Sequence, residues 1–117
     1  MTGMKLVEIK DLLGCEVLTG EEDLSVDICQ VLASDGMSEI LAVTQSKELM
    51  ITGLTNFQSI RTADIAGVSA VLYCRGKRPD KKVIEFAKHK RIPVLATKMI
   101  MFDICGILYN KGLKGVS

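Results

Sequence analysis

Tryptophan is absent from this 117-residue chain, aromatic residues make up only 4% of it, and histidine occurs once. With so few aromatic side chains, a platform that stacks nucleic-acid bases is not expected. The net charge of +1 argues against the basic excess that nucleic-acid and membrane-surface binders use. We therefore expect neither a nucleic acid nor a membrane as partner, although fifteen Lys and Arg residues still allow a local anion site.

The four cysteines lie far apart, and no two of them have the C-x-x-C spacing that is typical of zinc sites. Cys29, Cys74 and Cys105 sit in apolar runs, where cysteine behaves as a small hydrophobic side chain, so we expect buried, reduced thiols. We expect no metal and no cofactor. The first residues lack the apolar core of a signal peptide, and charged residues interrupt the most apolar stretch, 92–109. These features favour a cytoplasmic protein.

Common catalytic motifs are also missing. The sequence contains neither a G-x-x-x-x-G-K-[ST] phosphate loop nor a G-x-S-x-G nucleophile motif. The single histidine, His89, lies among Lys and Arg residues at an expected helix end, where positive charge complements the helix dipole. No two aspartates have a spacing that suggests a general acid–base pair. We therefore expect a protein that is not an enzyme.

What the chain does contain is an alternation of short apolar runs and helical patterns. Strands are predicted at residues 15–18, 26–33, 49–51, 69–74 and 93–96; a helix is predicted over 5–13 and after each of the last four strands. This pattern predicts the α/β class: one three-layer domain over residues 1–117, with a largely parallel sheet of about five strands flanked by helices. We expect an ordered core over about residues 5–110, and glycines 112 and 115 indicate a tail that frays.

Polar turns follow the last four predicted strands. Because the carboxyl ends of parallel strands meet at one edge of a sheet, all four turns are expected on the edge where such folds bind ligands. The candidate residues are Ser34 and Asp35 in the first turn, Thr52, Gly53, Thr55 and Asn56 in the second, and Arg75, Gly76, Lys77, Arg78 and Asp80 in the third. The fourth turn, Thr97-Lys98, supplies no candidate ligand-binding residue.

The third turn is the strongest candidate. Three cations follow a buried strand and precede a helix amino terminus, which carries partial positive charge and free N–H groups. Gly76 would let the backbone approach a ligand closely. These features suit a phosphate or carboxylate, and the alternative is an exposed basic loop ahead of a helix that starts at Pro79.

The first two turns have a simpler alternative. Their hydroxyls, amide and glycine could hold a ribose, a base or a phosphate, yet the same residue types are those that cap helices. Ser34 or Asp35, Thr55 or Asn56, and Thr97 in the last turn are each expected to cap the helix that follows.

Five stretches together resemble the DRTGG domain family over residues 5 to about 109. They are EVLTGEE (16–22), ASDGMSEIL (33–41), ITGLTN (51–56), RGKRPD (75–80) and IPVLAT (92–97). The resemblance implies a small α/β unit that is similar to the amino-terminal domain of HPr kinase and occurs alone or attached to phosphotransacetylases and regulatory pyrophosphatases. It further implies a regulatory or ligand-sensing role, a tendency to dimerise, and, as in the pyrophosphatases, recognition of an adenine nucleotide at a dimer contact.

One stretch departs from the family pattern. Cys29-Gln30-Val31 stands at the positions of the name-giving Thr-Gly-Gly, so the close backbone approach that two glycines permit is lost there. Two hypotheses follow. The first is a dimeric, non-catalytic module that binds a small anion, such as phosphate or an adenine nucleotide, at the strand-end loops. The second is a protein-interaction subunit that docks on a partner enzyme without a small-molecule ligand.

Overall fold

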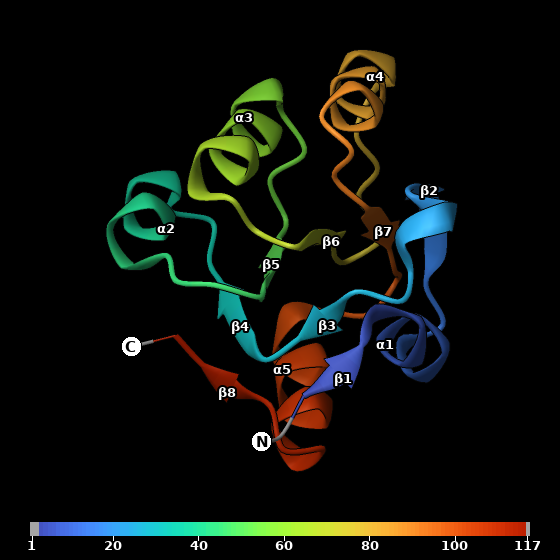
Figure 1. Cartoon of the computed structure of the whole chain (residues 1–117), viewed down its shortest axis with the longest axis vertical. Coiled ribbons are helices and arrows are strands. Elements are labelled where there is room, and N and C mark those ends of the chain that lie inside the picture. The colour runs from blue at the N-terminus through green and yellow to red at the C-terminus, as the bar shows by residue number, and fades with distance from the viewer. Residues whose placement is uncertain (1–2, 117) are drawn as a thin grey trace.

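A six-stranded sheet forms the centre of the computed structural model, which describes residues 3–116 (Figure 1). In spatial order its strands are β2 (Glu16–Thr19), β7 (Val94–Ala96), β6 (Ala70–Tyr73), β5 (Glu48–Thr52), β4 (Gln30–Ala33) and β8 (Lys114–Gly115). Only β2 runs antiparallel to its neighbour; every other adjacent pair is parallel. The predicted largely parallel sheet is therefore confirmed, with six strands in place of about five.

Helices cover both faces of this sheet (Figure 1). On one face lie α2 (Met37–Val43), α3 (Phe57–Ala66) and α4 (Lys81–His89); on the other lie α1 (Leu6–Leu13) and α5 (Met101–Asn110). A short 3₁₀ turn, η1 (Glu21–Asp23), follows β2. The α/β fold with three layers, inferred from the alternation of strands and helices, is thus confirmed.

The segment expected as one strand over residues 26–33 is divided between two sheets. β3 (Asp27–Ile28) pairs antiparallel with β1 (Met4–Lys5) in a separate small sheet, which the Lys5 Nζ–Asp27 Oδ1 ion pair of 2.8 Å also joins. At Cys29 the amide instead donates to the carbonyl of Lys47, 2.9 Å away, and the chain then enters β4. Apolar periodicity predicts extended backbone but not which partner an extended segment pairs with, so the prediction of one strand was wrong.

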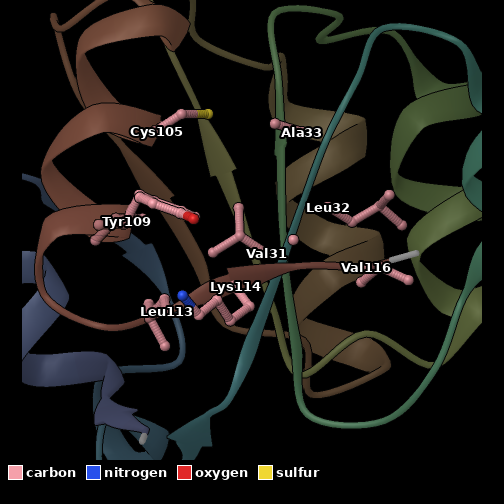
Figure 2. Close-up of a pocket in the computed structure, with 10 residues that line it drawn as sticks. Val31, Leu32, Ala33, Cys105, Tyr109, Leu113, Lys114 and Val116 are labelled. Carbon is pink, nitrogen blue, oxygen red and sulfur yellow. The ribbon is translucent and has the colours of Figure 1, made fainter.

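The tail that was expected to fray also forms part of the sheet. β8 pairs in parallel with β4, and the amide of Val116 donates to the carbonyl of Val31 at 3.1 Å (Figure 2). Leu113, just before β8, is only 2% exposed. The reason is that β4 would otherwise present unpaired backbone groups along its outer edge, a need that local glycine signals cannot show.

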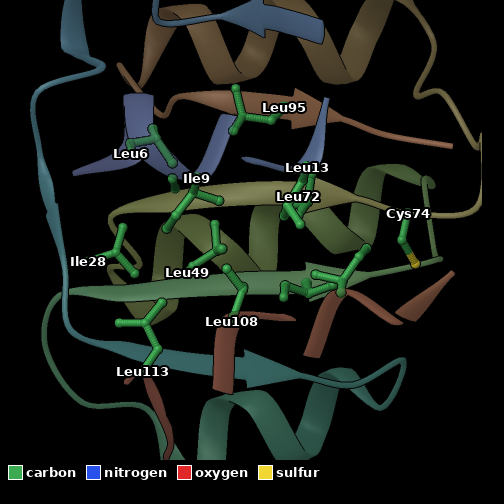
Figure 3. Packing of buried hydrophobic residues seen from close by; sticks show 13 residues of the cluster. Leu6, Ile9, Leu13, Ile28, Leu49, Leu72, Cys74, Leu95, Leu108 and Leu113 are labelled. Carbon is green, nitrogen blue, oxygen red and sulfur yellow. The ribbon is translucent and has the colours of Figure 1, made fainter. Parts of the chain in front are cut away.

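Apolar side chains fill both spaces between the sheet and its helices. Leu49 and Leu72 point towards α1 and α5, where they meet Leu6, Ile9, Leu13 and Leu108 (Figure 3), and Ile51 belongs to the same cluster. Met50 and Val71 point to the opposite side, into the cluster that contains residues of α2, α3 and α4. All four residues of β6 are fully buried, as expected for a central strand.

The cysteines differ in burial. Cys74 is buried, whereas Cys15, Cys29 and Cys105 are half-buried, and all four are free thiols. The expectation of burial is thus met in full only by Cys74. Over residues 3–116, no His, Cys, Asp or Glu side chains gather in threes in a way that could hold a metal ion. No helix in that same range has both the length and the apolar character needed to cross a membrane.

Candidate functional site

The four polar turns do meet at one edge of the sheet. They follow β4, β5, β6 and β7, which are parallel neighbours, so their carboxyl ends share one side. Within this edge the turns form two groups, one around Asp35 and one around Arg78.

Asp35 holds the first two turns together. Its Oδ1 accepts hydrogen bonds from the Thr52 hydroxyl and from the Gly53 amide, both at 2.8 Å. A Cβ added at Gly53 would lie 3.6 Å from the Asp35 carboxylate, which is ordinary van der Waals contact, so the space around position 53 does not require a glycine. The Ser34 hydroxyl accepts from the Gly36 amide at 2.9 Å. Gly36, not Ser34 or Asp35, is the N-cap of α2, and no side chain caps that helix. The predicted cap was wrong because the carboxylate of Asp35 instead accepts hydrogen bonds from the turn after the neighbouring strand β5.

The second turn ends in a helix cap. Asn56 Oδ1 accepts from the amide of Ser59 at 3.0 Å, which confirms Asn56 as the cap of α3, while the half-buried Thr55 precedes it. The Ser59 hydroxyl in turn shares a buried hydrogen bond of 2.8 Å with the hydroxyl of Tyr73. The Asn56 side-chain oxygen is therefore occupied by the helix cap.

The third turn is tight and basic. Arg75 and Gly76 both have positive φ (61° and 71°), and the amide of Lys77 donates to the carbonyl of Cys74 at 3.2 Å, the pattern of a type I′ turn. The amides of Arg75 and Gly76 donate to the carbonyls of Met99 and Thr97, at 2.7 and 2.9 Å. These two amides thus bind the fourth turn, and the exposed side chains of the loop are the groups left to meet a ligand.

Two further residues of the third turn have defined partners. Asp80 Oδ1 caps α4 by accepting from the amide of Val83 at 3.2 Å. Arg78 forms a two-pronged ion pair with Glu16, whose second contact, Nη2 to Oε2, is 3.1 Å. The hydrogen bond from Arg78, together with its charge, lowers the pKa of Glu16 and keeps that carboxylate ionised.

A pocket of about 420 Å³ lies beside this ion pair, between β2, the end of α1 and the loops after β6 and β7. Its polar lining comes from Glu16, Arg78, Thr97 and Lys98, and its apolar lining from Leu13, Ala96 and Met99, with Gly14 and Gly76 completing it. This volume falls within the range of about 300–1,000 Å³ that small-molecule sites occupy.

Thr97 fixes one wall of the pocket. Its hydroxyl donates to the carbonyl of Leu13 at 3.0 Å and accepts from the amide of Met99 at 3.3 Å. The first bond ties the end of α1 to the end of β7 across 84 residues of sequence. Thr97 was predicted to cap the following helix, which was wrong: Ile100 is the N-cap of α5, and no side chain caps it.

The charges around the pocket favour an anionic ligand that also carries hydroxyl or amino groups. Glu16 neutralises part of the Arg78 charge, whereas Lys98 is exposed and forms no ion pair within residues 3–116. Two cations can bind a phosphate, a carboxylate such as Glu16 can accept from hydroxyl or amino groups, and the apolar wall can cover a ring.

Of the predicted residues, Gly76 and Arg78 line this pocket. Asp35, Thr52 and Gly53 form the neighbouring hydrogen-bonded group, and Asn56 and Asp80 cap helices. Sequence reasoning did not place Glu16, Thr97, Lys98 and Met99 at the site. Thr97 and Lys98 could have been found, since their turn follows a parallel strand on the same edge; Glu16 could not, because its position depends on the antiparallel addition of β2.

The thiols near this edge are weakly acidic. Burial, and after it the charge of Asp35, raises the pKa of Cys74, and burial raises the pKa of Cys105. Burial also raises the pKa of Cys15 to about 11. A neutral thiol is a poor nucleophile, so none of these three cysteines has the properties of a reactive thiolate at neutral pH.

Comparison with known proteins agrees with the observed fold. The family model of the DRTGG domain matches residues 8–109. A solved structure, the CBS and DRTGG domains of the regulatory region of Clostridium perfringens pyrophosphatase complexed with the activator diadenosine tetraphosphate, superposes with a TM-score of 0.77 at 21% identity. The superposition covers 92% of this chain and 46% of that one, so this chain spans about half of that structure. At 21% sequence identity, this similarity shows a shared fold and nothing beyond it. No curated protein matches the chain.

Proposed function

Since this chain belongs to the DRTGG domain family, we propose that it is a non-catalytic regulatory module that binds an adenine nucleotide, or a similar small anion, at the carboxyl edge of its sheet. It works as a homodimer in the cytoplasm. The observation that carries the proposal is the 420 Å³ pocket, which combines two cations, one carboxylate and an apolar wall. The solved relative supports it, because that structure is a regulatory region in complex with a dinucleotide activator.

Within the pocket, each group has a defined task. Lys98 and Arg78 bind phosphate oxygens, and Arg78 exchanges part of its contact with Glu16 for the ligand. Glu16 accepts from ribose hydroxyls or from an exocyclic amine, and Met99 and Leu13 cover the base. Arg75 and Lys77, exposed on the same loop, add positive charge at the entrance. Cys29-Gln30-Val31, which stands at the Thr-Gly-Gly positions, does not line this pocket, so its departure from the family pattern leaves the pocket intact.

Isothermal titration calorimetry on the full chain tests the proposal. The panel is AMP, ATP, diadenosine tetraphosphate and inorganic phosphate. We expect heat of binding for at least one nucleotide, and about a tenfold weaker affinity for Arg78→Ala and for Lys98→Ala. Arg61→Ala is the matched control, since Arg61 is exposed on α3 and does not line the pocket. Absence of binding across the panel at millimolar concentration refutes the proposal, and so does an equal loss in the control.

A second candidate function is docking on a partner enzyme without a small ligand. It is favoured by the solved relative, in which the matched domain is one part of the regulatory region of an enzyme. Co-purification from cells followed by mass spectrometry separates the two functions. A stoichiometric enzyme partner, together with no heat of binding for any ligand in calorimetry, favours docking.

A further inference from the structure

The outer face of α5 has features that the single chain does not explain. Phe102 is 84% exposed and Tyr109 is 61% exposed, and their positions are seven apart in the sequence, which places both on one stripe of the helix. Between them lies Gly106, in the middle of the helix and exposed. An added Cβ at Gly106 would meet nothing within 4 Å, so the fold of one chain does not require a glycine there.

A glycine in a helix interior destabilises that helix by about 1 kcal/mol relative to alanine. Exposed aromatic side chains beside it add apolar surface in contact with water. Both features become favourable where another backbone approaches the helix closely and covers the aromatic rings.

An apolar groove adjoins the same stripe. It has a volume of about 310 Å³ and lies between α5 and the β4–β8 edge (Figure 2). Its walls include Val31, Ala33, Cys105, Leu108, Tyr109 and Leu113. The groove and the exposed side chain of Phe102 therefore belong to one surface, because Phe102 precedes Cys105 of the groove by about one helix turn.

We propose that this surface is the homodimer interface, in which the α5 helices of two copies cross antiparallel at Cys105-Gly106 and each Phe102 enters the groove of the other. The geometry of a two-fold axis carries the proposal. An axis between residues 105 and 106 relates position 102 of one helix to position 109 of the other, so each Phe102 is brought beside a Tyr109 and the groove that Tyr109 lines.

Charge is arranged in the same self-complementary way. Asp103 is exposed near the start of α5. Near the end of the same helix is Tyr109, and Lys114 Nζ lies 4.6 Å from the centre of its ring. In the antiparallel pair, Asp103 of each copy faces the end of the other copy's α5, which Lys114 of β8 follows. A parallel pair would instead bring like charges together, which favours the antiparallel arrangement.

This proposal identifies the surface of the homodimer named above, and it does not depend on which ligand is bound. Sedimentation velocity over a range of protein concentrations tests it without any ligand. The unmodified chain is expected to dimerise with a dissociation constant in the micromolar range or tighter. Phe102→Asp is expected to raise that constant by about tenfold or more, because an aromatic anchor is replaced by a charge. Ile65→Asp is the matched control, since Ile65 is 66% exposed on α3, away from α5.

Gly106→Leu tests the helix crossing separately. Leucine is a good helix former and position 106 is open in one chain, so the variant should fold, which circular dichroism and thermal unfolding verify. Its side chain should separate the two helices and weaken the dimer by a similar factor. The proposal is overturned by a monomeric unmodified chain at about 100 μM, by equal effects of Phe102→Asp and Ile65→Asp, or by unchanged dimerisation of Gly106→Leu.

Discussion

Leu113→Ala offers a sharp test of whether the end of the chain is part of the core. Leu113 is 2% exposed, belongs to the cluster between the sheet and α5, and its amide donates to the carbonyl of Leu108 at 3.2 Å. Substitution removes apolar carbon from a buried position just before β8. We therefore expect a clear loss of stability, although most sequence signals in this region indicate a tail that frays.

The magnitude follows from the surroundings of the side chain. Buried leucine-to-alanine changes cost about 2–5 kcal/mol, and the cost increases with the volume of the cavity that remains. Leu113 also lines the groove beside α5, which is open to solvent, so the space it leaves can be filled in part by water or by neighbouring side chains. We expect the lower part of that range, about 2–3 kcal/mol.

Urea unfolding followed by circular dichroism measures this loss at equilibrium. Leu12→Ala is the matched control: it removes the same atoms, but Leu12 is 38% exposed on α1, and alanine favours the helix. The control is expected to change the free energy of unfolding by less than about 1 kcal/mol. If both variants lose the same small amount, Leu113 is not part of the core and the assignment of β8 to the sheet is wrong.

Three further predictions concern the site and its supports. Glu16→Gln removes the carboxylate that competes for Arg78, so inorganic phosphate should bind about threefold more tightly at low ionic strength in calorimetry. Glu85→Gln, exposed on α4, should have no effect, and weaker phosphate binding by Glu16→Gln would contradict the role given to Arg78. Tyr73→Phe removes the buried hydrogen bond to Ser59 and should lower the free energy of unfolding by about 1 kcal/mol; a loss near zero would show that the bond adds nothing to stability. Burial raises the pKa of Cys15 to about 11 from its ordinary 9.0, so this thiol stabilises the fold below pH 9, and that contribution falls as the pH rises towards 11 because the unfolded thiol ionises first. Urea unfolding at pH 8 and pH 10 should therefore show a smaller loss of stability for Cys15→Ala than for the unmodified chain, and identical losses would refute the assigned burial.

Much of the architecture could be predicted because its signals are local. β6 is a continuous apolar run, buried in full as that pattern predicts, and Asn56 and Asp80 cap the helices that follow them. Once the strands are parallel, their order along the chain places the four polar turns on one edge, and this too was confirmed. The family resemblance added the proposed regulatory role, which no local pattern indicates.

The errors have a common cause, which is pairing between distant segments. Residues 26–33 were expected in one strand, yet their first part pairs with β1 and their second with β5. Asp35 and Thr97 were expected to cap helices, yet Asp35 accepts from Thr52 and Thr97 donates to Leu13. In each case the sequence pattern is compatible with a local interaction and with a distant one. The local interaction was predicted, and the distant one is observed in the structure.

The class of fold, the edge on which polar loops gather, and a basic loop from residue 75 to 80 on that edge can all be predicted from the amino-acid order, because hydrophobic periodicity and turn chemistry act over a few residues. The pairing of Arg78 with Glu16, the contribution of Lys98 and Met99 to the pocket, and the addition of β8 to the outer edge of β4 became evident only in the folded chain. Those contacts join residues far apart in the chain, and their free energy depends on backbone pairing and burial that arise only when the whole sheet has formed.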